Sequence, residues 1–490
     1  MLGLFGSLLA LGLLIWLAFR GISVIVLGPV MATIAAVFAA APLLATYTQV
    51  FMPALGGFIV AYLPLFLLGA IFGRLMDASG FARTIADAVV ATLGPERAIL
   101  ATVFACAVLT YGGVSLFVVA FAVYPIADQL FRTGGVPKRL LPAAIALGAF
   151  TFTMTALPGT PAIQNAIPMP FFGTTPFAAP GIGLITGAIM AVGGWLWLSR
   201  QASSAQERGE GYSTAPGLAE GDGVGTEAEP QAAPVSSPVV SPVVSSVPSP
   251  APPSDRSLVS VGIASVPIVL VIALNYLLSV QVFPRLDTAY LAEPAYGATD
   301  IAAVRGIWAI IVGLLVAILA ILATAREQLT APIAALQRGA EDALLPLFNT
   351  ASLVGFGAVV ASLPAFGLVR AGIDGLSDDA VVSLAISSSV LAGLTGSASG
   401  GMTIALDALG ADTLARATAD GIDPALLHRV VALATGGLDA LPHNGAVVTL
   451  LAICGLSHRE AYGPVFSVAV AIPVLALAAA ILLGSAFGAF

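Results

Sequence analysis

Two glycine- and proline-rich interruptions of apolar sequence recur in this chain at one constant spacing. The first half contains residues 112–115 (GGVS) and 157–160 (LPGT), and the second half contains residues 396–399 (GSAS) and 441–444 (LPHN). Gly112 and Gly396 are 284 positions apart, and so are Pro158 and Pro442. Backbone freed from helical hydrogen bonds is tolerated at membrane depth only where it lines a cavity or is buried in protein. Paired interruptions of this kind point to the binding site of a secondary transporter.

The composition agrees with a chain that lies mostly in lipid. Of its 490 residues 58% are hydrophobic and only 9% are charged, whereas soluble domains carry about 25% charged residues. We therefore expect an all-α polytopic membrane protein. No cluster of Lys and Arg is present to neutralise phosphates, so nucleic acid is not an expected partner. The two cysteines, Cys106 and Cys454, lie apart in apolar segments and predict neither a disulfide nor a metal site.

No enzyme motif is present. The sequence contains no GxSxG, no HExxH, no Walker loop and no GxGxxG that follows a strand. We expect no catalytic residues and no cofactor, and the energy for transport is expected to come from an ion gradient.

Apolar runs of about 20 residues, the length needed to span a bilayer, recur along nearly the whole chain. Two longer runs are broken in the middle and predict re-entrant hairpins, near 98–131 and 380–411. The remaining runs predict spans near 1–19, 22–42, 54–72, 140–172, 180–198, 258–280, 306–324, 344–362, 429–455 and 463–488. The two stretches 74–93 and 326–345 are amphipathic and are expected to lie along the membrane surface.

Five regions follow from this pattern: N-terminal spans (1–53), a first repeat (54–198), a linker (199–256), two connecting spans (257–325) and a second repeat (326–490). The linker is rich in Pro, Ser and Gly and is expected to be disordered. Basic residues flank the first hairpin and acidic residues the second, so the positive-inside rule places the two flanks on opposite sides. The linker falls on the cytoplasmic side, and the two repeats, each with a hairpin and a broken transmembrane helix, are predicted to be inverted. The basic flank consists of Arg74, Arg83, Arg97, Arg132, Lys138 and Arg139.

Glycines and hydroxyl residues at the hairpin tips are candidates for substrate binding, because the N-terminus of a half-helix attracts an anion. A second set of neutral donors and acceptors at the two downstream breaks is suited to substrate hydroxyl groups. The alternative is that the small residues allow close packing and the polar ones satisfy freed backbone. The candidates are Gly112, Gly113, Ser115, Ser397, Ser399 and Gly400 at the tips, and Thr160, Gln164, Asn165 and Asn444 at the breaks.

Few ionisable residues lie inside apolar segments, where each is a functional candidate by default. Asp439 and His443 flank the second break, and Asp407 follows the second tip. They are candidates for proton coupling, and the alternative for Asp439 and His443 is a pair that stabilises the break or contacts the substrate without titrating. His428 and His458 adjoin Arg429 and Arg459 at expected membrane edges and are predicted to contact solvent.

Four stretches resemble the gluconate permease (GntP) family of proton symporters: residues 109–119 (LTYGGVSLFVV), 149–161 (AFTFTMTALPGTP), 395–401 (TGSASGG) and 441–449 (LPHNGAVVT). The resemblance covers nearly the whole chain except residues 201–256. It implies proton-coupled uptake of small hydroxylated carboxylates, such as gluconate, related sugar acids, 3-hydroxybutyrate or D-serine, across a bacterial inner membrane. It also implies membership of the ion-transporter superfamily, whose members are homodimers with a scaffold and an elevator-like transport domain.

The sequence as a whole predicts a proton symporter whose anionic substrate lies between the two tips and the two breaks. One alternative is a sodium-coupled carboxylate carrier of similar architecture, with its ion held by freed carbonyls and the hydroxyls of Ser115 and Ser399. The other is a passive channel or a membrane sensor whose linker signals to a cytoplasmic partner.

Overall fold

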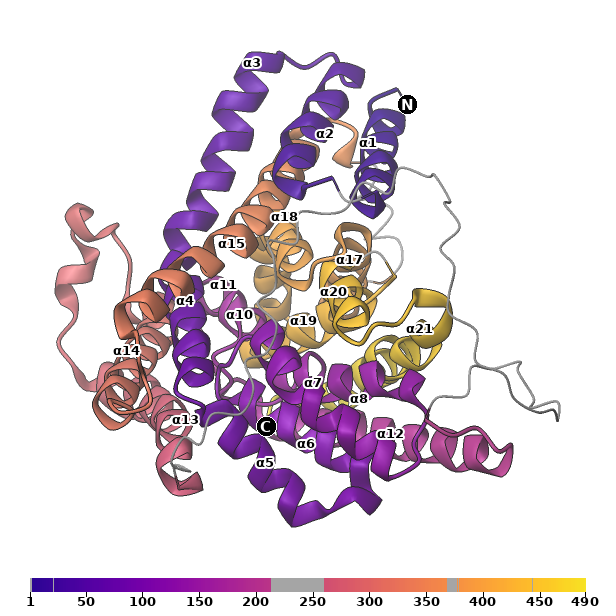
Figure 1. Cartoon of the computed structure of the whole chain (residues 1–490). Helices are drawn as coiled ribbons and strands as arrows, with labels where there is room; N and C mark the ends of the chain where they lie inside the picture. The colour runs from indigo at the N-terminus through magenta and orange to yellow at the C-terminus, as the bar shows by residue number, and fades with distance from the viewer. Residues whose placement is uncertain (1, 21, 213–259, 368–376, 378, 443) are drawn as a thin grey trace.

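The protein is helical throughout the part of the chain that the computed structural model describes, which is residues 2–20, 22–212, 260–367, 377, 379–442 and 444–490 (Figure 1). Within that part the elements follow one another as helices separated by short turns.

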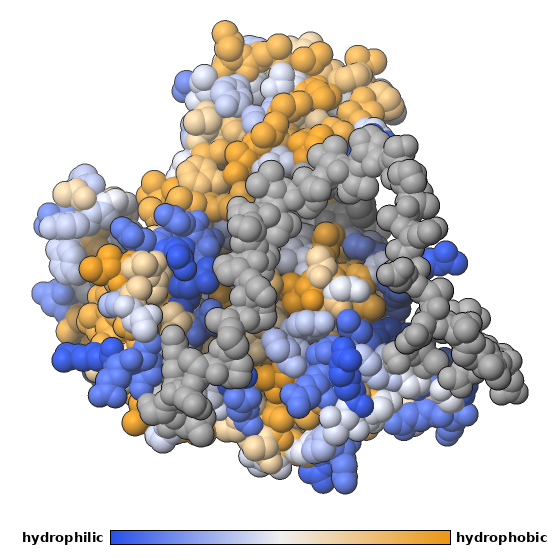
Figure 2. All heavy atoms as spheres, in the orientation of Figure 1, coloured by the Kyte–Doolittle hydropathy of each residue, from blue (hydrophilic) through white to orange (hydrophobic). Residues whose placement is uncertain are grey.

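The N-terminal helices form one end of the molecule. They are α1 (Leu2–Phe19), α2 (Val24–Phe38), the short α3 (Leu43–Thr46) and, after a π-helical turn (Tyr47–Phe51), the long α4 (Met52–Ala78). Their outward side chains are apolar, and Leu44 and Val60 are each 82% exposed. Figure 2 shows that this end is mostly hydrophobic on the side in view. Such a surface is stable in lipid and not in water.

Helix α4 packs along α15 (Pro332–Ser362) over much of its length (Figure 1). Glycines permit the close approach: a Cβ on Gly339 would lie 2.7 Å from the Cα of Ile71, and one on Gly355 would lie 2.8 Å from the Phe51 ring. Small residues are the usual means by which membrane helices reach van der Waals contact. This helix pair brings the two halves of the chain together.

The first half continues through α5 (Phe81–Leu93), a 3₁₀ turn (Pro95–Arg97), α6 (Ala98–Tyr111), α7 (Leu116–Thr133), a second 3₁₀ turn (Lys138–Leu140) and α8 (Leu141–Ala149). The chain bends by 102° between α5 and α6, where Gly94 has a φ of 75°. After α8 the helix is broken into α9 (Phe152–Thr155), α10 (Ile163–Ala166) and α11 (Pro168–Phe172), and α12 (Pro180–Glu207) follows.

Two helices separate the halves, α13 (Val261–Tyr276, extended by a π-helical turn at Leu277–Val282) and α14 (Ile301–Thr324), and short 3₁₀ turns at Phe283–Arg285, Ala289–Ala292 and Pro294–Tyr296 connect them. The second half then contains α15, α17 (Ala380–Thr395), α18 (Ala398–Ala419), α19 (Pro424–Leu438), α20 (Gly445–Ile453), α21 (His458–Phe466), a π-helical turn (Ser467–Ala471) and α22 (Ile472–Phe487).

The helix boundaries of the two halves agree at the 284-residue spacing found in the sequence. When 284 is added to the residue numbers of α6 and α7, the resulting ranges fall on α17 and α18. Both helix pairs are therefore interrupted at equivalent residues. The same shift brings residues 155–160, which begin at the last residue of α9, to residues 439–444 between α19 and α20.

Seven helices of the described chain are long and apolar enough to cross a membrane, or eight if the bent α5–α6 pair counts as one span. The protein is therefore a polytopic membrane protein. Shorter apolar helices, at Leu2–Leu14, Val24–Phe38, Ala380–Thr395 and Pro424–Leu438, accompany them. Helix α7, expected as one arm of a hairpin, itself meets the length and composition of a span.

Two expected boundaries differ from the structure. Residues 332–345 of the expected surface stretch and the span 344–362 share one continuous helix, α15, which Pro346 does not end. Helix α12 continues to Glu207, so the first residues of the expected linker are helical. The rest of that linker, from residue 213, lies outside the described residues.

Polar contacts fasten the chain beyond α12 to the end of α7; we call residues 128, 132, 139, 208, 210 and 212 the latch. The Glu210 carboxylate pairs with Arg139 and Arg208, both at 3.0 Å. The Tyr212 hydroxyl donates to Asp128, and the Arg132 guanidinium lies 4.4 Å above the Tyr212 ring. The latch therefore joins the beginning of the linker to the first helix pair.

The latch is expected to weaken in acid. Hydrogen bonds from Arg208 and then Arg139 lower the pKa of Glu210 below its usual 4.5. A carboxyl with a lowered folded-state pKa stabilises the fold above its unfolded pKa, and this contribution is lost as the pH falls through the folded value. We expect Glu210→Gln to reduce amide-exchange protection of residues 208–210 at neutral pH, with the difference from wild type shrinking below about pH 4.5. Glu207→Gln is the control, and a difference that does not change with pH would contradict the assignment.

Candidate functional site

The tip between α6 and α7, residues 112–115, lies against the break of its own half. We define that first break as residues 150–179, between α8 and α12. The Tyr111 hydroxyl donates to the Pro158 carbonyl at 2.7 Å. Gly113 has a φ of 96°, a conformation that favours glycine, and a Cβ at this position would lie 2.9 Å from Cγ of Pro161. The sequence therefore needs glycine here for both the turn and the approach.

Within the first break, side-chain amides donate hydrogen bonds to backbone carbonyls that have no partner in a helix. Asn165 Nδ2 donates to the carbonyls of Thr160 at 3.0 Å and Pro176 at 2.9 Å. Asn275 of α13 donates to the Gly159 carbonyl at 3.1 Å. Thr160 and Asn165 are both fully buried. For Asn165 this is the backbone-satisfying role that the sequence left open beside substrate binding.

Other polar atoms near the first break have no partner. Gln164 Oε1, Asn275 Oδ1 and Thr110 Oγ1 are buried and unpaired within the described part of the chain. Buried polar atoms normally have a hydrogen-bond partner. These atoms come from α10, α13 and the end of α6, and they are available to a bound hydroxyl group or cation.

The second tip, residues 396–399, is likewise bonded to the second break, which we define as residues 439–444 between α19 and α20. Asn444 Nδ2 donates to the Gly396 carbonyl at 3.1 Å, while Asn444 Oδ1 caps α20 by accepting from the backbone N–H of Ala446 at 2.6 Å and Val447 at 3.1 Å. Asn444 thus positions the break and the tip at once.

Hydroxyl groups gather at the second tip. Ser397 caps α18 by accepting from the Gly400 N–H at 3.2 Å. Ser399 Oγ lies 3.4 Å from Ser397 Oγ and 3.5 Å from Thr350 Oγ1 of α15. The structure therefore brings the predicted residues of this tip together and adds Thr350, which the sequence did not indicate because it lies on a separate helix.

The candidates for proton coupling lie at two different places. Asp439 follows the last residue of α19 and is partly buried. Asp407 is exposed on α18 and interacts electrostatically with Tyr62 of α4. Neither takes part in an ion pair within the described residues. His443 lies outside the described residues, so its pairing with Asp439 stays a prediction.

The prediction that His428, beside Arg429 at an expected membrane edge, contacts solvent is wrong. Both side chains are fully buried. His428 Nδ1 lies 2.6 Å from the Thr174 hydroxyl and Nε2 lies 3.1 Å from Asn165 Oδ1. His458 is partly buried as well, and its Nε2 lies 3.0 Å from the Pro442 carbonyl. His428 therefore bonds residues of the first break, and His458 bonds a residue of the second break.

The error has a physical origin. Helix α19 begins at Pro424 and ends at Leu438, so Arg429 lies well inside this short helix and not at the edge of a long span. The sequence carried one usable signal, since an ionisable residue inside an apolar segment is a functional candidate by default. Its partners, on the first break more than two hundred positions away, give no local signal.

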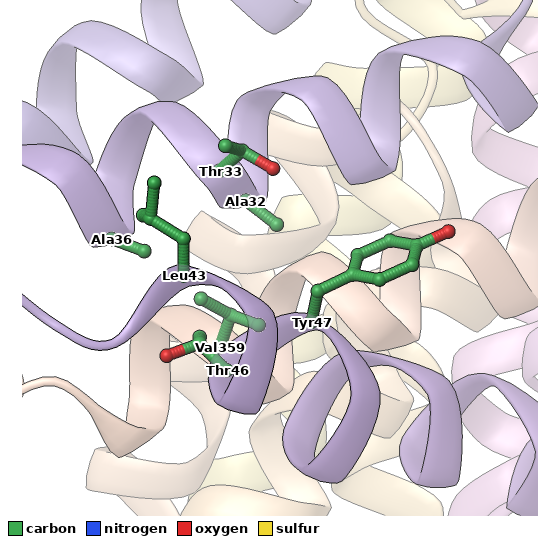
Figure 3. A pocket seen from close by; sticks show the side chains of 7 residues that line it. All are labelled: Ala32, Thr33, Ala36, Leu43, Thr46, Tyr47 and Val359. Carbon is green, nitrogen blue, oxygen red and sulfur yellow. The ribbon is translucent and has the colours of Figure 1, made fainter.

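Two clusters result, one at each tip and break. The hydrogen bonds of the described residues join each tip to the break of its own half, and α19 runs from the first cluster to the second. A separate small pocket lies between α2, α3, the following π turn and α15 (Figure 3). It carries no charged side chain and is therefore a poor place for an anion; its lining residues are Ala32, Thr33, Ala36, Leu43, Thr46, Tyr47 and Val359.

Comparison with known proteins gives one informative similarity. No family model matches the chain. The chain is 42% identical over 469 residues to the protein of Bacillus subtilis (strain 168) described as "Uncharacterized transporter YxjC", and the match covers 94% of each chain.

Replacing Asn165 is expected to destabilise the protein far more than replacing its neighbour. Asn165→Ala leaves the Thr160 carbonyl without its donor and removes the Oδ1 that bonds His428 and Arg429, and each buried group left unpaired costs about 1–3 kcal/mol. Gln164→Ala removes a side chain whose Oε1 has no partner. We expect the apparent melting temperature in detergent to fall by several degrees for Asn165→Ala and to stay near wild type for Gln164→Ala. Equal values for the two variants would refute the structural role of Asn165.

Proposed function

The chain belongs to the same transporter family as YxjC, and on that premise we propose that it is a secondary active transporter that imports a small hydroxylated carboxylate by proton symport. The observation that carries the proposal is a hydrogen bond in each half that joins the tip region to the break: Tyr111 donates to Pro158 in the first half, and Asn444 donates to Gly396 in the second. The resemblance to the gluconate permeases supplies the substrate class, which includes gluconate, related sugar acids and 3-hydroxybutyrate. It also supplies the location in a bacterial inner membrane.

We propose that the two halves are inverted repeats and that each tip belongs to a re-entrant hairpin. Equal helix boundaries at the 284-residue spacing support the repeat, and the opposite charge of the two flanks supports the inversion. The 102° bend before α6 supports a hairpin, because it turns the chain away from a straight crossing. By the same resemblance the protein is proposed to be an elevator-type homodimer.

The proposed substrate lies between the tips. Its carboxylate is held by N–H groups at half-helix N-termini, since these carry partial positive charge. Its hydroxyl groups bond the side chains of Gln164 and Thr160 and the hydroxyls at Ser397 and Ser399, while Asn444, whose Nδ2 and Oδ1 are bonded to backbone, positions the second tip. The unpaired Oε1 of Gln164 supports this role, whereas Asn165 acts indirectly by shaping the first break.

Protons offset the charge of the substrate in this proposal. Asp439 is the first candidate, because it lies directly at the second break, is partly buried and has no ion-pair partner within the described residues. Asp407 is the second. A carboxylate in such a position favours the protonated form, and release of the proton on the opposite side completes the cycle.

Sodium coupling is the second candidate, and one observation favours it. The unpaired buried oxygens of Asn275, Gln164 and Thr110 are the oxygen ligands that hard cations prefer. A sodium ion there would need no titrating side chain.

Uptake into proteoliposomes distinguishes these mechanisms. Purified protein is given labelled gluconate, 3-hydroxybutyrate or D-serine under an inward proton gradient without sodium. We expect one compound to accumulate against its gradient, and a protonophore to abolish the accumulation. Accumulation only after sodium is added would favour the sodium mechanism. Equilibration without accumulation would indicate a passive channel, and no uptake of any compound would refute the substrate class.

Asp439→Asn tests the proton role separately. If Asp439 carries the coupled proton, the variant is expected to lose accumulation driven by the proton gradient while retaining exchange of labelled for unlabelled substrate, because exchange needs no net proton movement. Asp420→Asn, a change of the same kind on an exposed loop residue, is the control. Unchanged accumulation by Asp439→Asn would remove this residue from the mechanism.

A further inference from the structure

Arg429 is fully buried, and the first break surrounds its guanidinium. Its Nε donates to the Ala178 carbonyl at 3.1 Å and its Nη2 to the same oxygen at 2.8 Å and to the Pro176 carbonyl at 3.4 Å. Its Nη1 donates to the Thr155 carbonyl at 3.3 Å and to Asn165 Oδ1 at 3.2 Å. A guanidinium has five N–H donors, and these five bonds use all of them.

The four acceptor atoms are neutral, and none is a carboxylate. Hydrogen bonds to carbonyl dipoles reduce the cost of burying a cation but leave its net charge in place. No described ion pair includes Arg429. A buried charge of this kind is usually paired, so the missing counter-charge calls for an explanation.

The geometry also excludes direct contact between Arg429 and a substrate. Because every N–H is already bonded to the break, a carboxylate can reach the guanidinium only by displacing a carbonyl. Arg429 nevertheless lies near Pro158, since a Cβ on Gly183 would lie 3.3 Å from Arg429 Nε and 3.4 Å from Pro158 Cδ, and the Pro158 carbonyl accepts from Tyr111 beside the first tip. Its positive potential therefore extends to the first tip without a hydrogen bond.

The two halves differ in whether a buried arginine bonds the break. The position equivalent to Arg429 at the 284-residue spacing is Ile145. In the described part of the chain, no arginine or lysine bonds the second break: Tyr462 bonds the Ala440 carbonyl at 3.1 Å and His458 the Pro442 carbonyl, while Asn444 of the break bonds Gly396 of the tip. Within the described residues, the buried positive charge is thus confined to the first break.

We infer that Arg429 is the fixed counter-charge of the transported carboxylate, and that it orients the substrate with its carboxylate toward the first tip and its hydroxyl groups toward the serines of the second. The inference rests on the proposed function. Arg429 is a positioning residue: it acts through the electrostatic field and through the break that it holds, not by touching the substrate.

The test compares an anion with a neutral molecule of the same shape. Thermal stability of the purified full-length protein is titrated with 3-hydroxybutyrate against 3-hydroxybutyramide, and with gluconate against gluconamide, to give apparent dissociation constants. A residue that only maintains the fold would weaken both members of a pair alike. A counter-charge changes the ratio between them.

Three variants are compared with wild type. Arg429→Lys keeps the charge and loses the fork of donors, and Arg429→Gln removes the charge. Arg305→Gln is the matched control, since Arg305 is a partly buried arginine whose Nη2 bonds the Gly173 carbonyl of the same segment at 3.3 Å. We expect wild type and Arg305→Gln to prefer the anion, Arg429→Lys to keep most of the preference with weaker affinity, and Arg429→Gln to lose about tenfold or more of it.

The outcomes separate the two proposals. A wild-type protein stabilised by neither anion refutes the proposed substrate class and with it this inference. A wild-type protein that prefers the anion, with Arg429→Gln preferring it equally, refutes the inference alone. If Arg429→Gln does not fold, Arg429→Lys decides, because loss of the preference in a folded lysine variant would show that positive charge at this position is not sufficient.

Discussion

A backbone carbonyl that leaves a helix in apolar surroundings must find another donor, and this requirement governs both breaks. In water the freed groups would be solvated at little cost, but inside an apolar bundle each one left unpaired costs several kcal/mol. The donors that meet it come from elsewhere in the chain: Asn275 from α13, Tyr111 from α6 and Arg429 from α19 at the first break. Tertiary hydrogen bonds thus stabilise the nonhelical backbone of the breaks, and the same bonds position the tips.

The local part of this architecture was predictable from the sequence. Gly113, Pro158 and Pro442 each lie in an interruption of an apolar run, and the 284-residue spacing showed that the interruptions of the two halves correspond. The nonlocal part was not. Which side chain reaches a freed carbonyl depends on how α13 and α19 pack, and no periodicity reports that. Arg429 was therefore placed at a membrane edge, and Asn275 was not identified at all. The length of α15 was also misjudged, because a change of composition along a helix does not end it.

The two halves share a framework but differ in their electrostatics. At equivalent positions the first half has Thr155 and the second Asp439, the first has Thr160 and the second Asn444, and Ile145 matches Arg429. The first break thus receives a buried cation from the opposite half, while the second carries an acidic group. A site with one positive and one acidic side is suited to an anion that travels with a proton. The two halves thus agree in the spacing of their interruptions and differ in the charged residues at corresponding positions.

The latch has a mechanical consequence for the polypeptide between the halves. Through Glu210 and Tyr212 the end of α12 is fastened to Arg139 and to Asp128 of α7. Any displacement of the first helix pair toward or away from the membrane surface must either carry this anchorage along or break it. The connection between the halves therefore begins on the part of the molecule that bears the first tip, and a pull on that connection from outside would be transmitted directly to the site.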